Sequence, residues 1–155
     1  MSPARAALAA ALLALLPVPA TAQEIDRADP VATARAALVA FRTRDLEALS
    51  RLSNETNRET FAQLLEAGPG SEMYDEIFSG WQVEAVDAWD GALGNPRYDS
   101  QGHAHVPFAI DEGEWEGTPY TDILTLVMTD EGAGWGIEDI NSPDLERFGD
   151  MAPTP

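Results

Sequence analysis

The chain has 155 residues, a formal net charge of −18 and no cysteine. Its 27 acidic residues outnumber its 9 basic ones, and a surface with this balance repels nucleic acids and anionic lipid headgroups, so we expect no nucleic-acid partner. Without cysteine the chain forms neither disulfides nor thiolate metal sites, and hydrophobic burial must hold the fold.

Residues 1–22 predict a signal peptide. Residues 1–5 carry one positive charge, residues 6–16 form an unbroken apolar run, and small residues at 20–22 make a cleavage site. The apolar run is too short to cross a membrane, because a spanning helix needs roughly 20 residues. We therefore expect an exported protein, periplasmic or secreted, with no membrane anchor. Residues 23–28 follow as a short polar tail.

Helical signals fill residues 29–80. Asp29 can cap a helix that has Pro30 in its first position. Apolar residues then recur at spacings of three and four, which places them on one face of that helix: Val31, Ala34, Leu38 and Phe41. Asp45 and Ser71 can cap further helices.

After Gly80 the hydrophobic period changes to two, which predicts strands. The expected strands are 81–89, 104–110, 119–129 and 135–140. Pro107 cannot donate a ladder hydrogen bond, so its strand should lie at an edge or carry a bulge. We expect residues 111–117 to form an acidic hairpin connection, in which an exposed Trp115 would indicate a contact surface.

Helices followed by an antiparallel meander predict an α+β fold. The N-terminal helices should pack on a bent, mainly antiparallel sheet of about four to five strands, because the sheet's apolar side chains need cover.

Four segments of the chain carry a family resemblance. They are the helix from Asp29 to Phe41, the helix start Arg44-Asp45-Leu46, the strand start Gly80-Trp81, and the closing strand 134–140. In these segments the chain resembles the NTF2-like superfamily, also called the SnoaL-like or cystatin-like α+β cone. The resemblance covers one domain over residues 29–148 and implies a bent sheet that encloses a pocket. The proline-rich residues 149–155 are expected to form a flexible tail.

Five residues are expected to line such a pocket: Trp81, Phe108, Tyr120, Leu124 and Trp135. The chain contains no Gly-x-Ser-x-Gly elbow, phosphate-binding loop or dinucleotide fingerprint. We therefore expect no cofactor.

Proton transfer of the ketosteroid-isomerase or SnoaL type is the sharper chemical hypothesis. It needs a carboxylate base in an apolar pocket and a hydrogen-bond donor for the developing enolate. Asp122 and Tyr120 are expected on the inner face of the long strand, and Asp87 on the strand that begins at Trp81. No catalytic residue of the family is carried over to this chain.

His103 and His105 are separated by one strand residue, so their side chains point to the same face and could reach one metal ion. The alternative places both in solvent on the outer face of the sheet. We expect no metal site, because the sequence selects no third ligand.

The expected function is an exported module that binds a small apolar ligand or a protein partner, without catalysis of its own. Its acidic sheet favours a cationic partner. One alternative is the proton-transfer enzyme, which requires a buried carboxylate beside a donor in a cavity of roughly 300 Å³ or more. Another is an accessory subunit that forms a homodimer through its sheet and shows a contiguous apolar patch.

Overall fold

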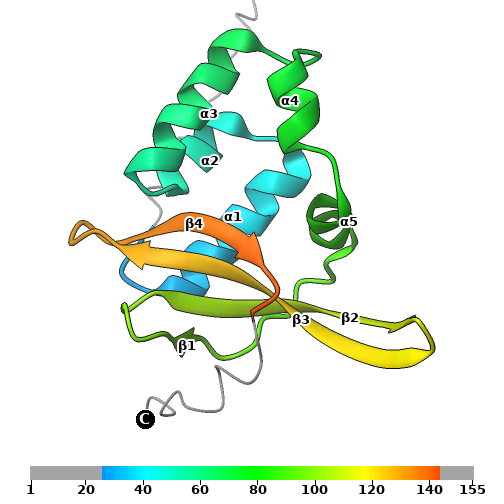
Figure 1. Cartoon of the computed structure of the whole chain (residues 1–155). Helices are drawn as coiled ribbons and strands as arrows, with labels where there is room; N and C mark the ends of the chain where they lie inside the picture. The colour runs from blue at the N-terminus through cyan, green and yellow to red at the C-terminus, as the bar shows by residue number, and fades with distance from the viewer. Residues whose placement is uncertain (1–25, 144–155) are drawn as a thin grey trace, which may run out of the picture.

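The computed structural model describes residues 26–143, so the predicted signal peptide and the tail at 149–155 lie outside it. Within this range five helices precede a sheet of four strands (Figure 1), which confirms the α+β prediction. The helices are α1 (Pro30–Thr43), α2 (Leu46–Leu52), α3 (Glu55–Ala67), α4 (Glu72–Ile77) and α5 (Trp81–Ala88). The strands are β1 (Arg97–Tyr98), β2 (Ala104–Trp115), β3 (Thr118–Asp130) and β4 (Trp135–Asn141).

The first helices begin where their capping residues predict. The Asp29 carboxylate accepts a hydrogen bond from the Val31 N–H at 3.0 Å, with Pro30 in the first turn. The Asp45 carboxylate likewise accepts from the Ala48 N–H at 2.9 Å and starts α2. These side chains satisfy backbone donors that have no partner within a helix.

Residues 81–88 form a helix, which corrects the predicted strand at 81–89. Trp81 and Val83 alternate with polar residues as a strand would, but the buried side chains are Val83, Val86 and Trp89. These three are spaced by three residues and therefore lie on one helical face. The segment is short enough to fit either period, and the helical spacing determines which side chains enter the core.

The sheet is antiparallel throughout, in the order β1-β2-β3-β4. The register between β2 and β3 shifts between Pro107 and Ala109, which confirms the predicted bulge at the proline. Strand β1 pairs only with Ala104 and His105, so Pro107 lies beyond its end. The Pro107 carbonyl instead accepts a hydrogen bond from the Gly94 N–H at 2.8 Å.

The core lies between the helices and the inner face of the sheet. Figure 1 shows the helices gathered on one side of the sheet, and α1 contacts β2, β3 and β4. The apolar stripe of α1 contributes Leu38 and Phe41, while β2 and β3 contribute Val106 and Leu126. All four side chains are buried, as packing of the predicted stripes against the sheet requires.

The β2–β3 hairpin extends beyond the helices as a two-stranded ribbon (Figure 1). The predicted acidic connection at 111–117 is mostly strand, because Asp111 to Trp115 pair with residues of β3. Only Glu116 and Gly117 form the turn, with φ values of 49° and 80°. Two consecutive positive φ values are typical of the tight turn that matches the twist of a hairpin, and they allow pairing to continue to its end.

Candidate functional site

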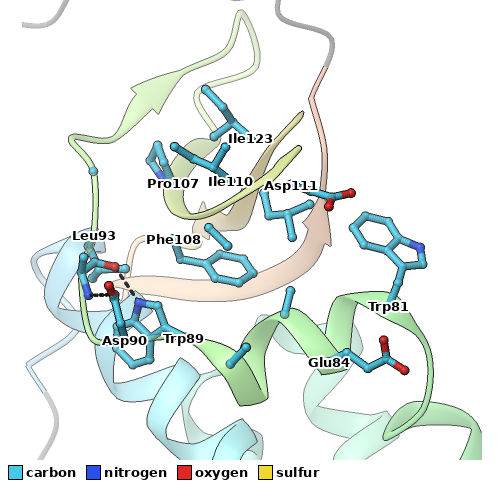
Figure 2. Close-up of a pocket in the computed structure, with 16 residues that line it drawn as sticks. Trp81, Glu84, Trp89, Asp90, Leu93, Pro107, Phe108, Ile110, Asp111 and Ile123 are labelled. Carbon is cyan, nitrogen blue, oxygen red and sulfur yellow. Dashed lines mark hydrogen bonds between the residues drawn. The ribbon is translucent and has the colours of Figure 1, made fainter. Parts of the chain in front are cut away.

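A groove of about 810 Å³ lies between α5, the loop that follows it, and strands β2 and β3 (Figure 2). Its apolar lining includes Trp89, Phe108 and Leu124, which are buried, and Trp81, which is 49% exposed. The groove therefore offers aromatic and aliphatic surface that a small molecule can reach from solvent.

The loop at the end of α5 is fixed by hydrogen bonds. The indole N–H of Trp89 donates to the Ala92 carbonyl at 2.5 Å, and the Asp90 carboxylate accepts from the Ala92 N–H at 2.8 Å. Two arginines of α1 hold the same loop: Arg35 donates to the Gly91 carbonyl at 2.7 Å and Arg42 to the Trp89 carbonyl at 3.1 Å. This wall of the groove is thus anchored to the core helix.

Three carboxylates line the groove, from Glu84, Asp90 and Asp111. Among the described residues that line it, none is basic. Asp90 uses one carboxylate oxygen within the loop, whereas Glu84 and Asp111 are exposed residues near Trp81 in Figure 2. An apolar floor with acidic edges favours a ligand that is apolar and positively charged.

The structure brings three of the five predicted pocket residues to this groove: Trp81, Phe108 and Leu124. Tyr120 and Trp135 do not line it. Tyr120 lies farther out on the hairpin, with its ring against Gly113. Trp135 begins β4 and contacts Tyr98, with ring centroids 5.9 Å apart.

The three candidate residues for proton transfer, Asp87, Tyr120 and Asp122, do not lie in one cavity. Asp87 lies on α5 and is paired with Arg44, the nearest oxygen–nitrogen distance being 2.8 Å. Tyr120 and Asp122 were expected on the inner face of the long strand, and both are exposed because β3 continues past the helices. The Asp111 charge beside Tyr120 raises the pKa of that phenol, whose hydroxyl donates to the Asp111 carboxylate at 3.4 Å.

His103 and His105 share a partner, Asp99. The same Asp99 oxygen lies 3.0 Å from His103 Nδ1 and 3.2 Å from His105 Nε2. Glu138 lies on the other side of His103, 3.6 Å from its Nε2. The expectation that both imidazoles lie in solvent is wrong for His105, which is buried beneath this cluster of polar side chains.

Asp99 is held in its ionised form. Burial raises the pKa of its carboxyl, but hydrogen bonds from the His103 backbone, the His105 side chain and the Gln101 backbone outweigh burial and lower the pKa to about 2. Over residues 26–143, no group of three or more histidine, aspartate or glutamate side chains is arranged to hold a metal ion. The contacts of His103 and His105 with Asp99, and of His103 with Glu138, join the start of β2 to the preceding loop and to β4.

Sequence reasoning missed Trp89, Glu84 and Asp90 as groove residues. They reach the groove because residues 81–88 form a helix and the chain then turns back toward β2. The Asp90-Gly91 pair was a usable signal for that turn. These residues were missed because residues 81–88, which precede the turn, were predicted as a strand and not as a helix.

None of the helices in the described part of the chain is long and apolar enough to cross a membrane. Comparison with protein-family models found no match, and no curated protein or solved structure matches the chain either.

Proposed function

We propose that the protein is a binding module without catalysis of its own, and that the groove between α5 and β2 takes a small apolar molecule carrying a positive charge. The observation that carries this proposal is that aromatic side chains and carboxylates line one groove and that no basic residue is among the described residues that line it. The volume of about 810 Å³ lies within the range of small-molecule sites.

The two ends of such a ligand have different partners. Its apolar part lies against Phe108 and Leu124 on the floor and covers Ile110, which is 67% exposed, so apolar surface of the ligand and of Ile110 is removed from water. Its cationic part lies near Trp81, Glu84 and Asp111, where ring faces attract cations and the carboxylates add opposite charge.

A binding function fits the groove better than proton transfer does, because the carboxylates of Glu84 and Asp111 are exposed to solvent. A general base works best where burial raises its pKa toward neutral, and Glu84 and Asp111 are both exposed. Asp111 does accept a hydrogen bond from Tyr120, but this contact lies on the projecting hairpin.

A matched pair of probes tests the proposal. Tetraphenylphosphonium and tetraphenylborate have nearly the same size and shape and opposite charges, and their binding to the purified protein is measured by isothermal titration calorimetry. We expect the cation to bind at least about tenfold more tightly, a ratio that corresponds to ~1.4 kcal/mol. Equal affinities, or tighter binding of the anion, would contradict the proposal.

Variants assign the binding to the groove. Glu84→Gln with Asp111→Asn should weaken binding of the cation and leave binding of the anion unchanged or stronger. Glu59→Gln with Glu66→Gln removes the same charge from the exposed surface of α3 and is the control. If both double variants weaken binding of the cation equally, net charge and not the groove is responsible.

We further propose that the chain is an exported member of the NTF2-like superfamily. Helices on one face of an antiparallel sheet support this, as do two register shifts, in which Phe108 of β2 and Glu138 of β4 are the extra residues. The rings of Tyr98 on β1 and Trp135 on β4 lie with their centroids 5.9 Å apart, although these strands are the opposite edges of the sheet, and this contact supports a curved sheet. An experimental structure with a flat sheet would contradict this assignment.

Export is tested on the mature protein. When the full sequence is expressed in a Gram-negative bacterium, intact-mass measurement of the periplasmic fraction should give a chain that begins at Gln23. A full-length chain found only in the cytoplasm would contradict export.

A further inference from the structure

The outer part of the β2–β3 hairpin, residues 110–122, is a two-stranded ribbon that we call the arm; at its base Ile110 and Asp111 also line the groove. Every residue from Ile110 to Asp122 is exposed except Gly113, which lies under the Tyr120 ring. Figure 1 shows the arm extending away from the helices. Two-stranded ribbons without further cover are marginally stable in water, so this length of paired chain lacks the packing that usually supports a hairpin.

The arm carries large apolar side chains in solvent. Ile110 is 67% exposed, Trp115 is 73% exposed and Tyr120 is 36% exposed. Tryptophan and tyrosine are enriched at protein interfaces, because they provide a large contact area and lose few rotamers on binding. The condition set in the sequence analysis, that Trp115 be exposed, is met near the end of the arm.

The edge of β2 along the arm is also open. Within residues 26–143, β1 pairs with β2 only at Ala104 and His105, and the Gly94 N–H donates a hydrogen bond to the Pro107 carbonyl. From Ala109 to Trp115 no described strand lies beside this edge, and it contains no proline. The opposite edge contains Pro119, which cannot donate to a new strand. The β2 edge is thus the better template for an added strand.

The negative charge of the arm determines which kind of strand can bind along the β2 edge. The arm contains five acidic residues and no lysine or arginine; the acids are Asp111, Glu112, Glu114, Glu116 and Asp122. A second copy of this chain, with its own net charge of −18, would bring like charges together along the edge. A basic strand would instead neutralise them.

The two faces of the arm set the pattern of that strand. Glu112 and Glu114 lie on one face, and Gly113 and Trp115 lie on the other, because successive strand residues point to opposite sides. We propose that the arm docks an extended segment of another protein in which basic and apolar residues alternate, added as a strand to the β2 edge between Ala109 and Trp115. Its basic side chains face Glu112 and Glu114, and its apolar side chains cover Trp115. Ala109, Ile110 and Asp111 at one end of this edge also line the groove, whereas residues 112–115 lie outside it, and the docking does not require a bound small ligand.

The test uses the purified protein and three labelled peptides of about eight residues, the length that spans this edge. One peptide alternates lysine and valine, the second alternates glutamate and valine, and the third alternates lysine and proline. The third has the charge of the first but cannot form a ladder of backbone hydrogen bonds. Binding is measured by fluorescence anisotropy, and amide hydrogen exchange is followed over residues 109–115.

We expect the lysine–valine peptide to bind at least about tenfold more tightly than either of the others and to slow amide exchange along the β2 edge. The variant with Glu112→Gln, Glu114→Gln and Glu116→Gln should lose most of this affinity. The control with Glu59→Gln, Glu66→Gln and Glu76→Gln has the same net charge and should keep it, because these residues lie on α3 and α4.

Three results would overturn the proposal. Equal binding of the lysine–proline peptide would show attraction by charge alone, without an added strand. Equal losses in the two triple variants would show that the arm is not the binding surface. Self-association of the protein through the arm in sedimentation experiments, with no binding of the lysine–valine peptide, would assign the edge to a second copy of this chain.

Discussion

The surroundings of Asp99 lower the pKa of its carboxyl. Its carboxylate accepts hydrogen bonds from the backbone N–H groups of Gln101 and His103, each at 2.9 Å, and contacts both imidazoles. The sequence pointed to His103 and His105 as a pair, but Asp99 lies in the loop before them and only the folded loop brings it there. Their common partner could not be predicted because many acidic residues were available to them.

The lowered pKa of Asp99 makes its contribution to stability depend on pH. Because the pKa is about 2 in the folded protein and 3.8 as the ordinary value, the contribution is complete above pH 4 and is lost as pH falls toward 2. We expect Asp99→Asn to reduce the free energy of unfolding by about 1–2 kcal/mol at pH 7 and by almost nothing at pH 2. Urea unfolding at several pH values measures the difference between the two proteins. A difference that is constant from pH 7 to pH 2 would contradict this account.

Phe108 tests the floor of the groove. It is 6% exposed and lies at the bulge of β2, between the core and the groove. We expect Phe108→Ala to cost about 3 kcal/mol, at the lower end of values for phenylalanine in cores, because the deletion enlarges an open groove and does not create a closed void. Val39→Ala, on the exposed side of α1, is the control and should cost less than about 0.5 kcal/mol. Chemical denaturation that gives less than about 1 kcal/mol for Phe108→Ala would place its ring outside the core.

At the scale of elements, α5 decides the shape of the candidate site. The caps and apolar spacing of α1 and α2 predict those helices well, because the signals are local. Between Trp81 and Trp89 the same residues fit alternation and a spacing of three, and what selects the helix is packing of Val83, Val86 and Trp89 into the core. Phe108 and Leu124 lie on strands that were predicted correctly, and both were predicted to line the pocket. Glu84 and Asp90 lie on α5 and the loop after it, and neither was predicted.

The arm gives an electrostatic prediction for Tyr120. The Asp111 charge, and to a smaller extent that of Asp122, raises the pKa of this phenol above its ordinary 10.0. We expect Asp111→Asn to lower the pKa of Tyr120 toward that value, and Asp122→Asn to lower it less. The ring resonances of Tyr120, followed by NMR through alkaline pH, report both changes. An equal effect of the two variants, or none, would contradict the pairing of Asp111 with Tyr120.

At the scale of the whole molecule, net charge opposes compactness. With a formal charge of −18 at pH 7, the folded chain repels itself more than the expanded chain does. Raising sodium chloride from about 10 mM to about 150 mM shortens the screening length from about 30 Å to about 8 Å. The melting temperature should therefore rise by a few degrees, as measured by circular dichroism. A melting temperature unchanged over this range would show that the acidic residues are too well separated to destabilise the fold.

The central claim is that the groove between α5 and β2 binds apolar cations, and the four tryptophans allow a direct test. Trp81 and Trp89 line the groove, Trp115 lies on the arm, and Trp135 contacts Tyr98. In protein labelled with 5-fluorotryptophan, fluorine NMR during titration with tetraphenylphosphonium should shift the resonances of Trp81 and Trp89 and leave those of Trp115 and Trp135 in place. Shifts confined to Trp115 or Trp135, or no shift at all, would contradict the claim.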